Sequence, residues 1–325
     1  MAKKISNSFT NDELIYFYEK MFMIRKFEEK AAQLYGSGKI GGFLHLYIGQ
    51  EAVVVGILSS IKSEDTVVTS YRDHGHIIAR GVDPKQVMAE LTGRSTGISK
   101  GKGGSMHMFS KENRFYGGHG IVGAQVPIGV GLAFAHKYRE NNNISRVYVG
   151  DGAMSNGQVF ESFNLASLWE LPVLFIIENN KYAMGTAVTR SAAGNDLYDR
   201  AGTFGIKGEK VDGMNFFEVS NAAIRARDYI YENKKPYVIE MDTYRFRGHS
   251  MSDPGQYRSK DEVAEMKEND PLITMKKKLI DEFKVDEKEI NELELKIKKE
   301  VKEIEKYALD SPLPELKELF TEVYL

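Results

Sequence analysis

A Gly-Asp-Gly cluster and an Asn-Asn pair in the middle of the chain have the residue types that bind a hard divalent cation. Asp151 comes just after the apolar run 146–149, and Asn180 comes just after the apolar run 173–177. Such runs are typical of strands that are covered on both faces. The carboxyl ends of parallel strands meet at one edge of a sheet, so Asp151 and Asn180 should face one crevice. The 26 residues between the two clusters, 153–178, suffice for one helix and one strand.

The oxygen atoms available at this edge favour magnesium. Asp151 offers a carboxylate, Asn180 an amide oxygen, and the turn at Tyr182 a backbone carbonyl, which together are too few to complete an octahedral shell. Phosphate oxygens and water usually fill the remaining positions around Mg²⁺. The helix expected to begin near Ser155 points its N-terminus at the same crevice, which favours an anion. We therefore predict a site for Mg²⁺ and a phosphate-bearing ligand; the alternative is two unrelated turns, because Asp-Gly and Asn-Asn are common turn dipeptides.

The elements that must position these residues alternate along the chain. Strands are predicted at residues 66–70, 146–149, 173–177 and 237–241, and helices at 83–91, 124–138, 159–168 and 217–231. Alternating strands and helices predict an α/β fold, in which a doubly wound, mostly parallel sheet carries helices on both faces.

Two terminal helices flank this pattern. Thr10 and Glu13 are spaced as a capping box that opens a helix to about residue 34, which Gly36 and Gly38 would end. Near the other terminus, apolar residues recur every three or four positions over 286–310, which predicts an amphipathic helical arm that packs on the body or contacts a second subunit. We divide the chain into an α/β domain, 1–270, and a C-terminal helical extension of it, 271–325.

The composition excludes several classes of protein. Lys plus Arg number 44 and Asp plus Glu number 46, a net charge of −2, which argues against a nucleic-acid-binding protein. The absence of cysteine excludes disulfides, a thiolate nucleophile and cysteine-bound metals. No apolar stretch approaches the roughly 20 residues of a membrane helix, and the N-terminus lacks the pattern of a signal peptide. A cytoplasmic location is the expectation.

Three further motifs are weaker. The G-x-G-x-x-G pattern at 36–41 follows a predicted helix, whereas dinucleotide sites need a preceding strand. The G-x-S-x-G pattern at 97–101 could indicate a serine hydrolase, but a glycine-rich segment follows it where that class has a helix. The cluster 73–76 contains two histidines and an aspartate, which could bind a metal or form a loop whose polar side chains bond locally.

The spacing of the first two clusters resembles the thiamine diphosphate motif, and its surroundings resemble the α subunits of the dehydrogenase component of 2-oxo acid dehydrogenase complexes. The matching stretches are residues 42–52, 70–75, 101–107, 115–125, 178–185 and 244–254. The last of these contains R-G-H-S-M-S-D-P, which resembles the pyruvate dehydrogenase branch of bacterial heterotetrameric type. The resemblance implies the thiamine-diphosphate-binding fold.

The resemblance also implies roles for individual residues. Asp151, Asn180 and the carbonyl of Tyr182 would hold Mg²⁺. The residues that would contact thiamine diphosphate, besides these three, are Tyr71, Arg72, Gly120, Val122, Gly152, Ala153 and His249. His45 and His249 would face the reacting end of the cofactor, and the segment 247–258 around His249 is expected to be mobile.

The implied activity is oxidative decarboxylation of pyruvate and transfer of the acetyl unit to the lipoyl group of a dihydrolipoyl acetyltransferase. In this family a β subunit supplies the glutamate that activates the cofactor, so the implied assembly is an α2β2 heterotetramer and this chain holds half of each active site. Two alternatives stay open: an α subunit specific for another 2-oxo acid or for acetoin, and a non-enzymatic oligomerisation subunit.

Overall fold

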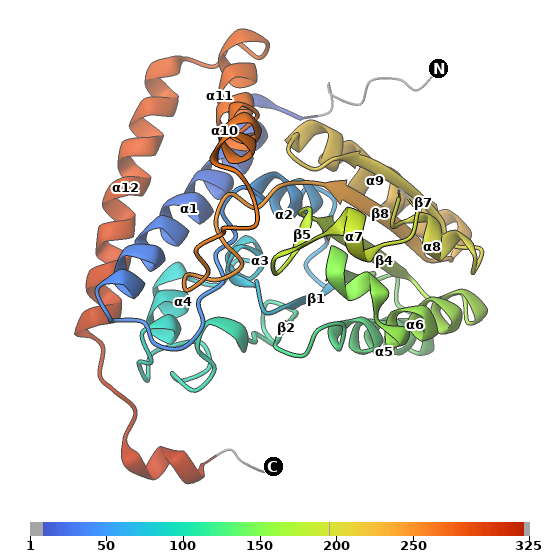
Figure 1. The fold of residues 1–325 in the computed structure, drawn as a ribbon, viewed down its shortest axis with the longest axis horizontal. Helices are drawn as coiled ribbons and strands as arrows, with labels where there is room; N and C mark the ends of the chain where they lie inside the picture. Colours follow the sequence, from blue (N-terminus) through green and yellow to red (C-terminus); the bar gives the residue numbers. More distant parts are fainter. Residues whose placement is uncertain (1–8, 195, 322–325) are drawn as a thin grey trace.

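The computed structural model describes residues 9–194 and 196–321, and a six-stranded parallel sheet lies at its centre (Figure 1). The strands pair in the order β2-β1-β3-β4-β8-β7, and each neighbouring pair is parallel. They are β1 (Thr66–Ser70), β2 (Phe115–His119), β3 (Ser145–Gly150), β4 (Val173–Asn179), β7 (Lys207–Asp212) and β8 (Tyr237–Asp242); β5 (Tyr182–Ala183) and β6 (Thr186–Ala187) form a small separate ribbon. The predicted α/β class is confirmed, while the two edge strands, β2 and β7, were not predicted.

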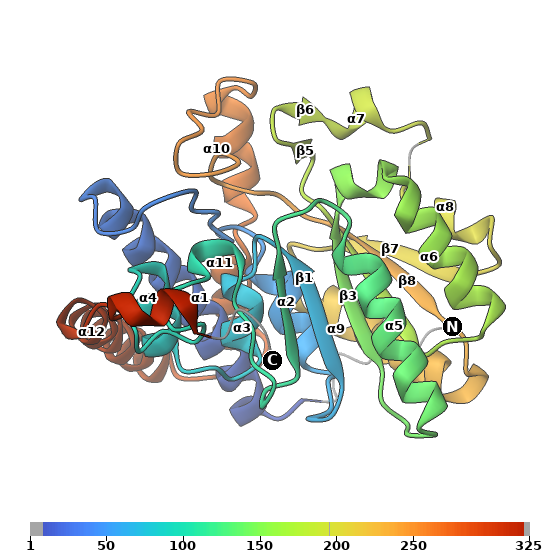
Figure 2. The same ribbon diagram turned by 90° about the horizontal axis from the view of Figure 1, so that it is seen from below.

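Helices cover both faces of the sheet (Figure 2). The α-helices are α1 (Asn11–Gly36), α2 (Glu51–Leu58), α3 (His74–Ala79), α4 (Pro84–Leu91), α5 (Gln125–Tyr138), α6 (Gly157–Leu168), α7 (Val188–Ser191), α8 (Asp199–Gly202), α9 (Phe216–Asn233), α10 (Lys260–Glu268), α11 (Pro271–Asp281) and α12 (Glu287–Asp310). The described residues also form the short 3-10 helices η2 (Gly104–Met106), η3 (Asp151–Ser155) and η4 (Leu316–Phe320).

The alternation of side chains along each strand produces two hydrophobic cores. In β4, Leu174 and Ile176 pack into the core that α1, α2 and α9 share, whereas Phe175 and Ile177 pack into the core under α5 and α6. Every residue of β4 is buried, as a strand covered on both faces requires. The apolar runs of the sequence therefore mark the central strands, and their carboxyl ends lie at one edge of the sheet.

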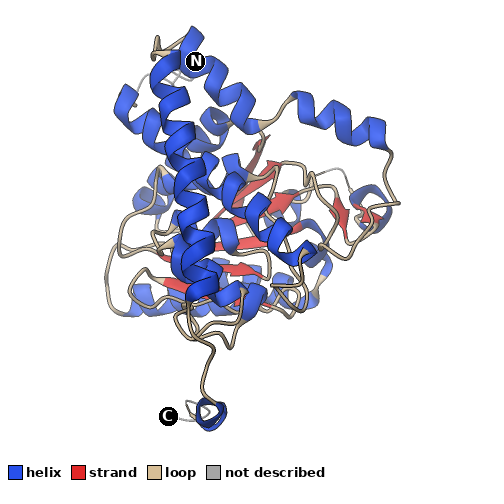
Figure 3. Cartoon of the chain, turned by 90° about the vertical axis from the view of Figure 1, so that its left-hand side faces the viewer, coloured by secondary structure: helices blue, strands red, loops and turns tan. Residues whose placement is uncertain are grey.

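The two terminal helices lie side by side on the outside of the first core (Figures 1 and 3). The predicted capping box at Thr10 and Glu13 is present, and α1 ends at Gly36. The apolar stripe of α12 is buried in the same core as α1, which agrees with a helical arm packed on the body. Residues 1–8 and 322–325 of the two predicted segments lie outside the described residues. In the described part of the chain, no helix is long and apolar enough to cross a membrane.

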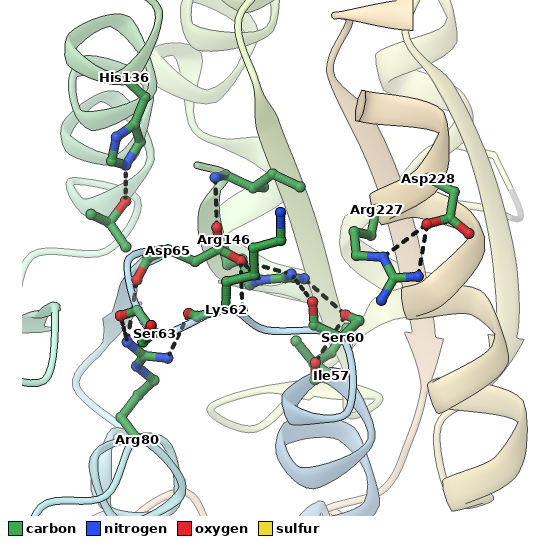
Figure 4. A network of polar contacts seen from close by, with 12 residues as sticks. Ile57, Ser60, Lys62, Ser63, Asp65, Arg80, His136, Arg146, Arg227 and Asp228 are labelled. Atoms are coloured by element: carbon green, nitrogen blue, oxygen red, sulfur yellow. Dashed lines mark hydrogen bonds and ion pairs between the residues drawn. The ribbon is translucent and has the colours of Figure 1, made fainter. Parts of the chain in front are cut away.

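A buried ion pair stabilises the sheet at the amino ends of its strands, opposite to the predicted site (Figure 4). Arg146, at the start of β3, contacts the Asp65 carboxylate at 3.0 Å and donates to the carbonyl of Ser60 at 2.7 Å. Asp65 also accepts from the backbone N–H of Ile144 at 2.8 Å. Both charged side chains are fully buried, so their hydrogen bonds fix the start of β1 relative to β3.

Candidate active site

A hollow of about 250 Å³ opens where β1, β3 and β4 end. It is lined by Ser70, Tyr71, Arg72, Val122, Gly123, Gln125, Gly150, Asp151, Gly152, Ala153, Glu178, Asn180, Tyr182, Ala183, Met184, Arg245 and His249. Nine of the eleven predicted site residues belong to this lining; His45 and Gly120 do not. A larger hollow, of about 600 Å³, lies beyond β7 and β8, but none of the predicted residues lines it. The chemistry-bearing residues therefore meet at the smaller hollow.

Asp151 is a buried carboxylate with unused hydrogen-bonding capacity. It follows β3 as the first residue of η3, is 5% exposed, and its Oδ2 atom has no hydrogen-bond partner in the protein. Burial raises the pKa of Asp151 to about 6, although Arg245 opposes this effect. A buried, unpartnered carboxylate is costly without a compensating charge, so this atom is suited to a cation.

Asn180, at the end of β4, points its amide oxygen at the same region. Its Nδ2 atom donates to Gln50 Oε1 at 3.2 Å, and this contact turns Oδ1 toward the hollow. Arg245 Nη1 donates to Asn180 Oδ1 at 3.1 Å and to the carbonyl of Tyr182 at 3.0 Å. One cationic group thus already contacts both neutral oxygens that were predicted as metal ligands, which shows that the two oxygens converge.

Tyr71 and Arg72 extend β1 into the hollow. The Arg72 guanidinium is buried and donates to the carbonyls of Leu46 at 2.7 Å and His249 at 2.8 Å. Burial and the nearby Arg245 lower the pKa of Arg72 to about 10, so it stays cationic at neutral pH. Arg72 therefore joins two segments far apart in the sequence and adds positive charge to the lining.

The two predicted catalytic histidines lie together. The ring centroids of His45 and His249 are 5.2 Å apart, and both rings contact Tyr71, at 4.6 and 5.7 Å. His249 lines the hollow, whereas His45 lies behind it, 6% exposed. Burial, with Arg72 as the next cause, lowers the pKa of His45 to about 2 and that of His249 to about 4. Both are neutral imidazoles at pH 7, and the Nδ1 atom of each has no hydrogen-bond partner in the protein.

The small residues that were predicted to contact the cofactor line the hollow, with one exception. Val122, Gly152 and Ala153 line the hollow, and a Cβ atom on Gly152 would come within 2.5 Å of Ala183 Cβ. Gly120 is not part of the lining; the atom nearest to a Cβ added there is in the His107 ring, at 3.1 Å. The α6 helix begins at Gly157, close to the predicted start.

Three polar residues that make hydrogen bonds at the site were given no role in the sequence analysis. Gln50 orients Asn180, Arg245 contacts the converging oxygens, and Glu178 lines the hollow while accepting a hydrogen bond from Tyr47 O–H. All three lie within the stretches that carry the family resemblance, and this resemblance was the signal that could have identified them. Their partners are more than 60 residues distant in sequence, so local spacing does not reveal them.

The 73–76 cluster is neither a metal site nor a loop. His74 opens the buried helix α3, and its ring contacts Glu28 and Ser105, residues remote in sequence. Among the described residues, no group of three or more His, Cys, Asp or Glu side chains could hold a metal ion. A cation at Asp151 must therefore draw further ligands from neutral oxygens and from a second ligand, as Mg²⁺ bound to a diphosphate does.

Comparison with known proteins agrees with this geometry. The family described as "Dehydrogenase E1 component" matches residues 19–317. A protein of Rickettsia felis named "Pyruvate dehydrogenase E1 component subunit alpha" is 56% identical over 315 residues, 97% of each chain. Proteins of the same name from Rhizobium meliloti and Zymomonas mobilis are 54% and 55% identical, covering 98% and 96% of this chain and 91% and 88% of their own lengths. The chain belongs to the dehydrogenase E1 component family.

Proposed function

We propose that the chain is the α subunit of a pyruvate dehydrogenase, an oxidoreductase that decarboxylates pyruvate and passes the acetyl unit to the lipoyl group of a dihydrolipoyl acetyltransferase. The full-length similarity to pyruvate dehydrogenase α subunits supports the substrate. The observation that carries the chemistry is the convergence of an unpartnered carboxylate and two neutral oxygens at the ends of β3 and β4.

These oxygens suit Mg²⁺ held with thiamine diphosphate. Asp151 Oδ2, Asn180 Oδ1 and the Tyr182 carbonyl would hold the cation, and Arg72 and the backbone N–H groups of Gly152 and Ala153 would hold the diphosphate. Tyr71 and Val122 would contact the rest of the cofactor, and Gly120 would need the neighbouring loop to move. Thiamine diphosphate, when bound, supplies the nucleophilic carbon and the electron sink for decarboxylation.

The two histidines would serve the reacting end of the site. His45 and His249 are neutral at pH 7, so each can accept a proton or donate its own N–H to the carboxylate or carbonyl of pyruvate. Their unpartnered Nδ1 atoms are free for such contacts. His45 is buried and His249 is partly buried, so the protein limits the access of water to this part of the site, which strengthens the electrostatic effect of the rings on the substrate.

A β subunit would complete the site. Within the described lining the acidic side chains are Asp151 and Glu178. Asp151 would hold the cation, and Glu178 accepts a hydrogen bond from Tyr47 O–H, so neither is free to activate the cofactor. Exposed apolar side chains lie just before α5, along it and at the end of the neighbouring α6; we call this set the apolar face: Ile121, Val122, Ile128, Phe134, Tyr138, Leu168 and Trp169. Val122 belongs both to this face and to the hollow, so a partner that covers the face also closes the site. An α2β2 assembly satisfies this requirement.

The test is reconstitution. The purified chain alone should not turn over pyruvate, whereas the chain assembled with a β subunit should bind thiamine diphosphate in a Mg²⁺-dependent manner and decarboxylate pyruvate. Turnover by the single chain, or assembly without cofactor binding, would contradict the proposal. A panel of pyruvate, branched-chain 2-oxo acids and acetoin distinguishes the alternative substrate specificities.

A further inference from the structure

A buried hydrogen-bonded chain runs beneath the segment that carries His45. Glu28 on α1 contacts His74 on α3, with Oε2 and Nδ1 2.9 Å apart, and His74 Nε2 lies 2.8 Å from Ser105 Oγ in η2. Glu28 and His74 are fully buried and Ser105 is 7% exposed. Burial is the largest single effect and would lower the pKa of His74, but Glu28, together with Asp73 and Ser105, outweighs burial and raises the pKa. The three side chains therefore form a linked carboxylate–imidazole–hydroxyl unit.

Both ends of this unit bind the same short segment. The backbone N–H of His45 donates to Ser105 Oγ at 3.4 Å, and the backbone N–H of Tyr47 donates to Glu28 Oε1 at 2.7 Å. In an extended backbone, N–H groups two residues apart point in the same direction, so the unit holds one edge of the segment at two points.

The other edge of the segment holds the loop that carries His249. The carbonyl of Leu44 accepts from Met251 N at 2.9 Å, and the carbonyl of Ile48 accepts from Phe246 N at 3.1 Å. Between them, the Leu46 carbonyl is joined to the His249 carbonyl through the Arg72 guanidinium. A shift of the segment 44–48 thus moves His45 directly and His249 through these carbonyl contacts.

The hydroxyl end of the unit is itself fixed in place. Glu90, at the end of α4, is fully buried and its carboxylate accepts four backbone N–H groups of the glycine-rich segment before Ser105. Two of these donors, Gly103 N at 2.7 Å and Gly104 N at 3.0 Å, directly precede Ser105. The other two are Ser99 N and Gly101 N, each at 2.8 Å. Charge-assisted bonds of this kind are strong, so Ser105 is held rigidly against His74.

The order carboxylate, imidazole, hydroxyl is also that of a serine-hydrolase triad. Ser105 is poorly suited to act as a nucleophile, because it is 93% buried and its oxygen already accepts the His45 N–H. The unit instead accepts hydrogen bonds from two backbone N–H groups of the segment that carries His45. We propose that Glu28, His74 and Ser105 are positioning residues that set the placement of His45, and through the segment 44–48 that of His249.

This inference rests on the proposed function for its kinetic test, but its structural test does not. Ser105→Ala removes the link to the His45 N–H, and Thr66→Val is the matched control. Thr66 Oγ1 lies 3.1 Å from His136 Nε2, a second buried hydroxyl–imidazole contact at the opposite edge of the sheet. Figure 4 shows His136 there, beside the Arg146 network.

In the assembled enzyme, Ser105→Ala should lower kcat for pyruvate on the order of tenfold or more, because misplacement by about 1 Å can cost roughly 100-fold. The affinity for thiamine diphosphate should stay within about twofold, since the unit does not touch the predicted cofactor ligands. A crystal structure of Ser105→Ala should show the centroids of His45 and His249 displaced from their 5.2 Å separation. The Thr66→Val control should leave kcat and both rings unchanged.

Glu28 provides an independent second test. Glu28→Gln keeps an oxygen for Tyr47 N–H and a polar group against His74, so kcat should stay within about threefold of the parent enzyme. Glu28→Leu deletes both contacts and should resemble Ser105→Ala. Unchanged ring positions in Ser105→Ala, or kcat equal to that of the control in both Ser105→Ala and Glu28→Leu, would overturn the inference. Absence of pyruvate turnover by the parent enzyme would instead refute the proposed function, and the ring positions would still decide the positioning role.

Discussion

Binding of Mg²⁺ to this protein should compete with a proton at Asp151. The pKa of this carboxyl is raised from 3.8 to about 6 by burial in the metal-free protein, so a cation can bind only after the proton leaves. With a pKa of about 6, the apparent Kd for Mg²⁺ should rise about twofold from its limiting value at pH 6 and about elevenfold at pH 5. At pH 7 the apparent Kd should exceed its limiting value by only about a tenth of that value.

The window from pH 5 to pH 7.5 isolates this carboxyl from the two histidines of the site. The pKa of His249 is lowered to about 4 and that of His45 to about 2, chiefly by burial, so both stay neutral throughout. The diphosphate also titrates, with a second ionisation near 6 for phosphate groups. Titrating Mg²⁺ into thiamine diphosphate alone at each pH measures that contribution, which is then subtracted.

The assay is calorimetric titration of Mg²⁺ into the assembled protein with saturating thiamine diphosphate. Replacing the carboxylate by an amide in Asp151→Asn should weaken Mg²⁺ binding by about 100-fold or more, since even outer-shell changes cost 10- to 100-fold. An apparent Kd that stays within twofold between pH 7 and pH 5, after the correction, would refute the assignment of Asp151 as a ligand.

The same pKa has a consequence for stability. Because the folded-state pKa lies above 3.8, the metal-free fold holds this proton more tightly than the unfolded chain does. The resulting stabilisation, about 3 kcal/mol as an order of magnitude, is fully present below pH 3.8 and is lost as the pH rises through 6. Mg²⁺ should restore it, so the gain in Tm on loading with Mg²⁺ and thiamine diphosphate should be larger at pH 7 than at pH 5.

Three further outcomes are expected. Gln50→Leu should weaken Mg²⁺ binding 10- to 100-fold, because Asn180 loses the acceptor that orients its amide, and an unchanged affinity would argue against this role. Residues 247–258 should become protease-resistant only when thiamine diphosphate is bound, and Ser250→Glu should reduce kcat by repelling the pyruvate carboxylate; equal protection in both states with a fully active variant would contradict this. Asp65→Ala should lower the free energy of unfolding by about 3–5 kcal/mol in urea titrations, since it leaves a buried guanidinium unpaired, and a loss below 1 kcal/mol would argue against a structural pair.

The central strands could be predicted because burial on both faces leaves an uninterrupted apolar run. The edge strands could not: β2 reads F-Y-G-G-H and β7 reads K-G-E-K-V-D, so one is rich in glycine and the other in charge. Edge strands need only one paired side and tolerate polar residues, and their sequences therefore resemble loops. The rule that parallel strands share a carboxyl edge nevertheless located the hollow, because Asp151 and Asn180 both follow central strands.

Contacts between remote segments set the limit of sequence reasoning at the site. The cluster 73–76 could be expected to bond locally, yet His74 contacts Glu28 and Ser105 because α3 is buried among segments that are distant in sequence. Likewise Gln50 meets Asn180 across 130 residues. Such pairs depend on how α1, α2 and the glycine-rich segment fold against the sheet, and no local periodicity encodes that arrangement.

The site therefore combines two parts with different origins. The oxygens that suit a metal and a diphosphate follow from the topology of the sheet, which brings Asp151 and Asn180 to one edge. The histidines follow from packing, because backbone hydrogen bonds, Arg72 and the contact between the two rings join the segment 44–48 to the loop after β8. Substitutions in the first part should change cofactor affinity, whereas substitutions in the support of the second should change kcat at constant affinity. Measuring both quantities for each variant separates the two parts, which neither measurement does alone.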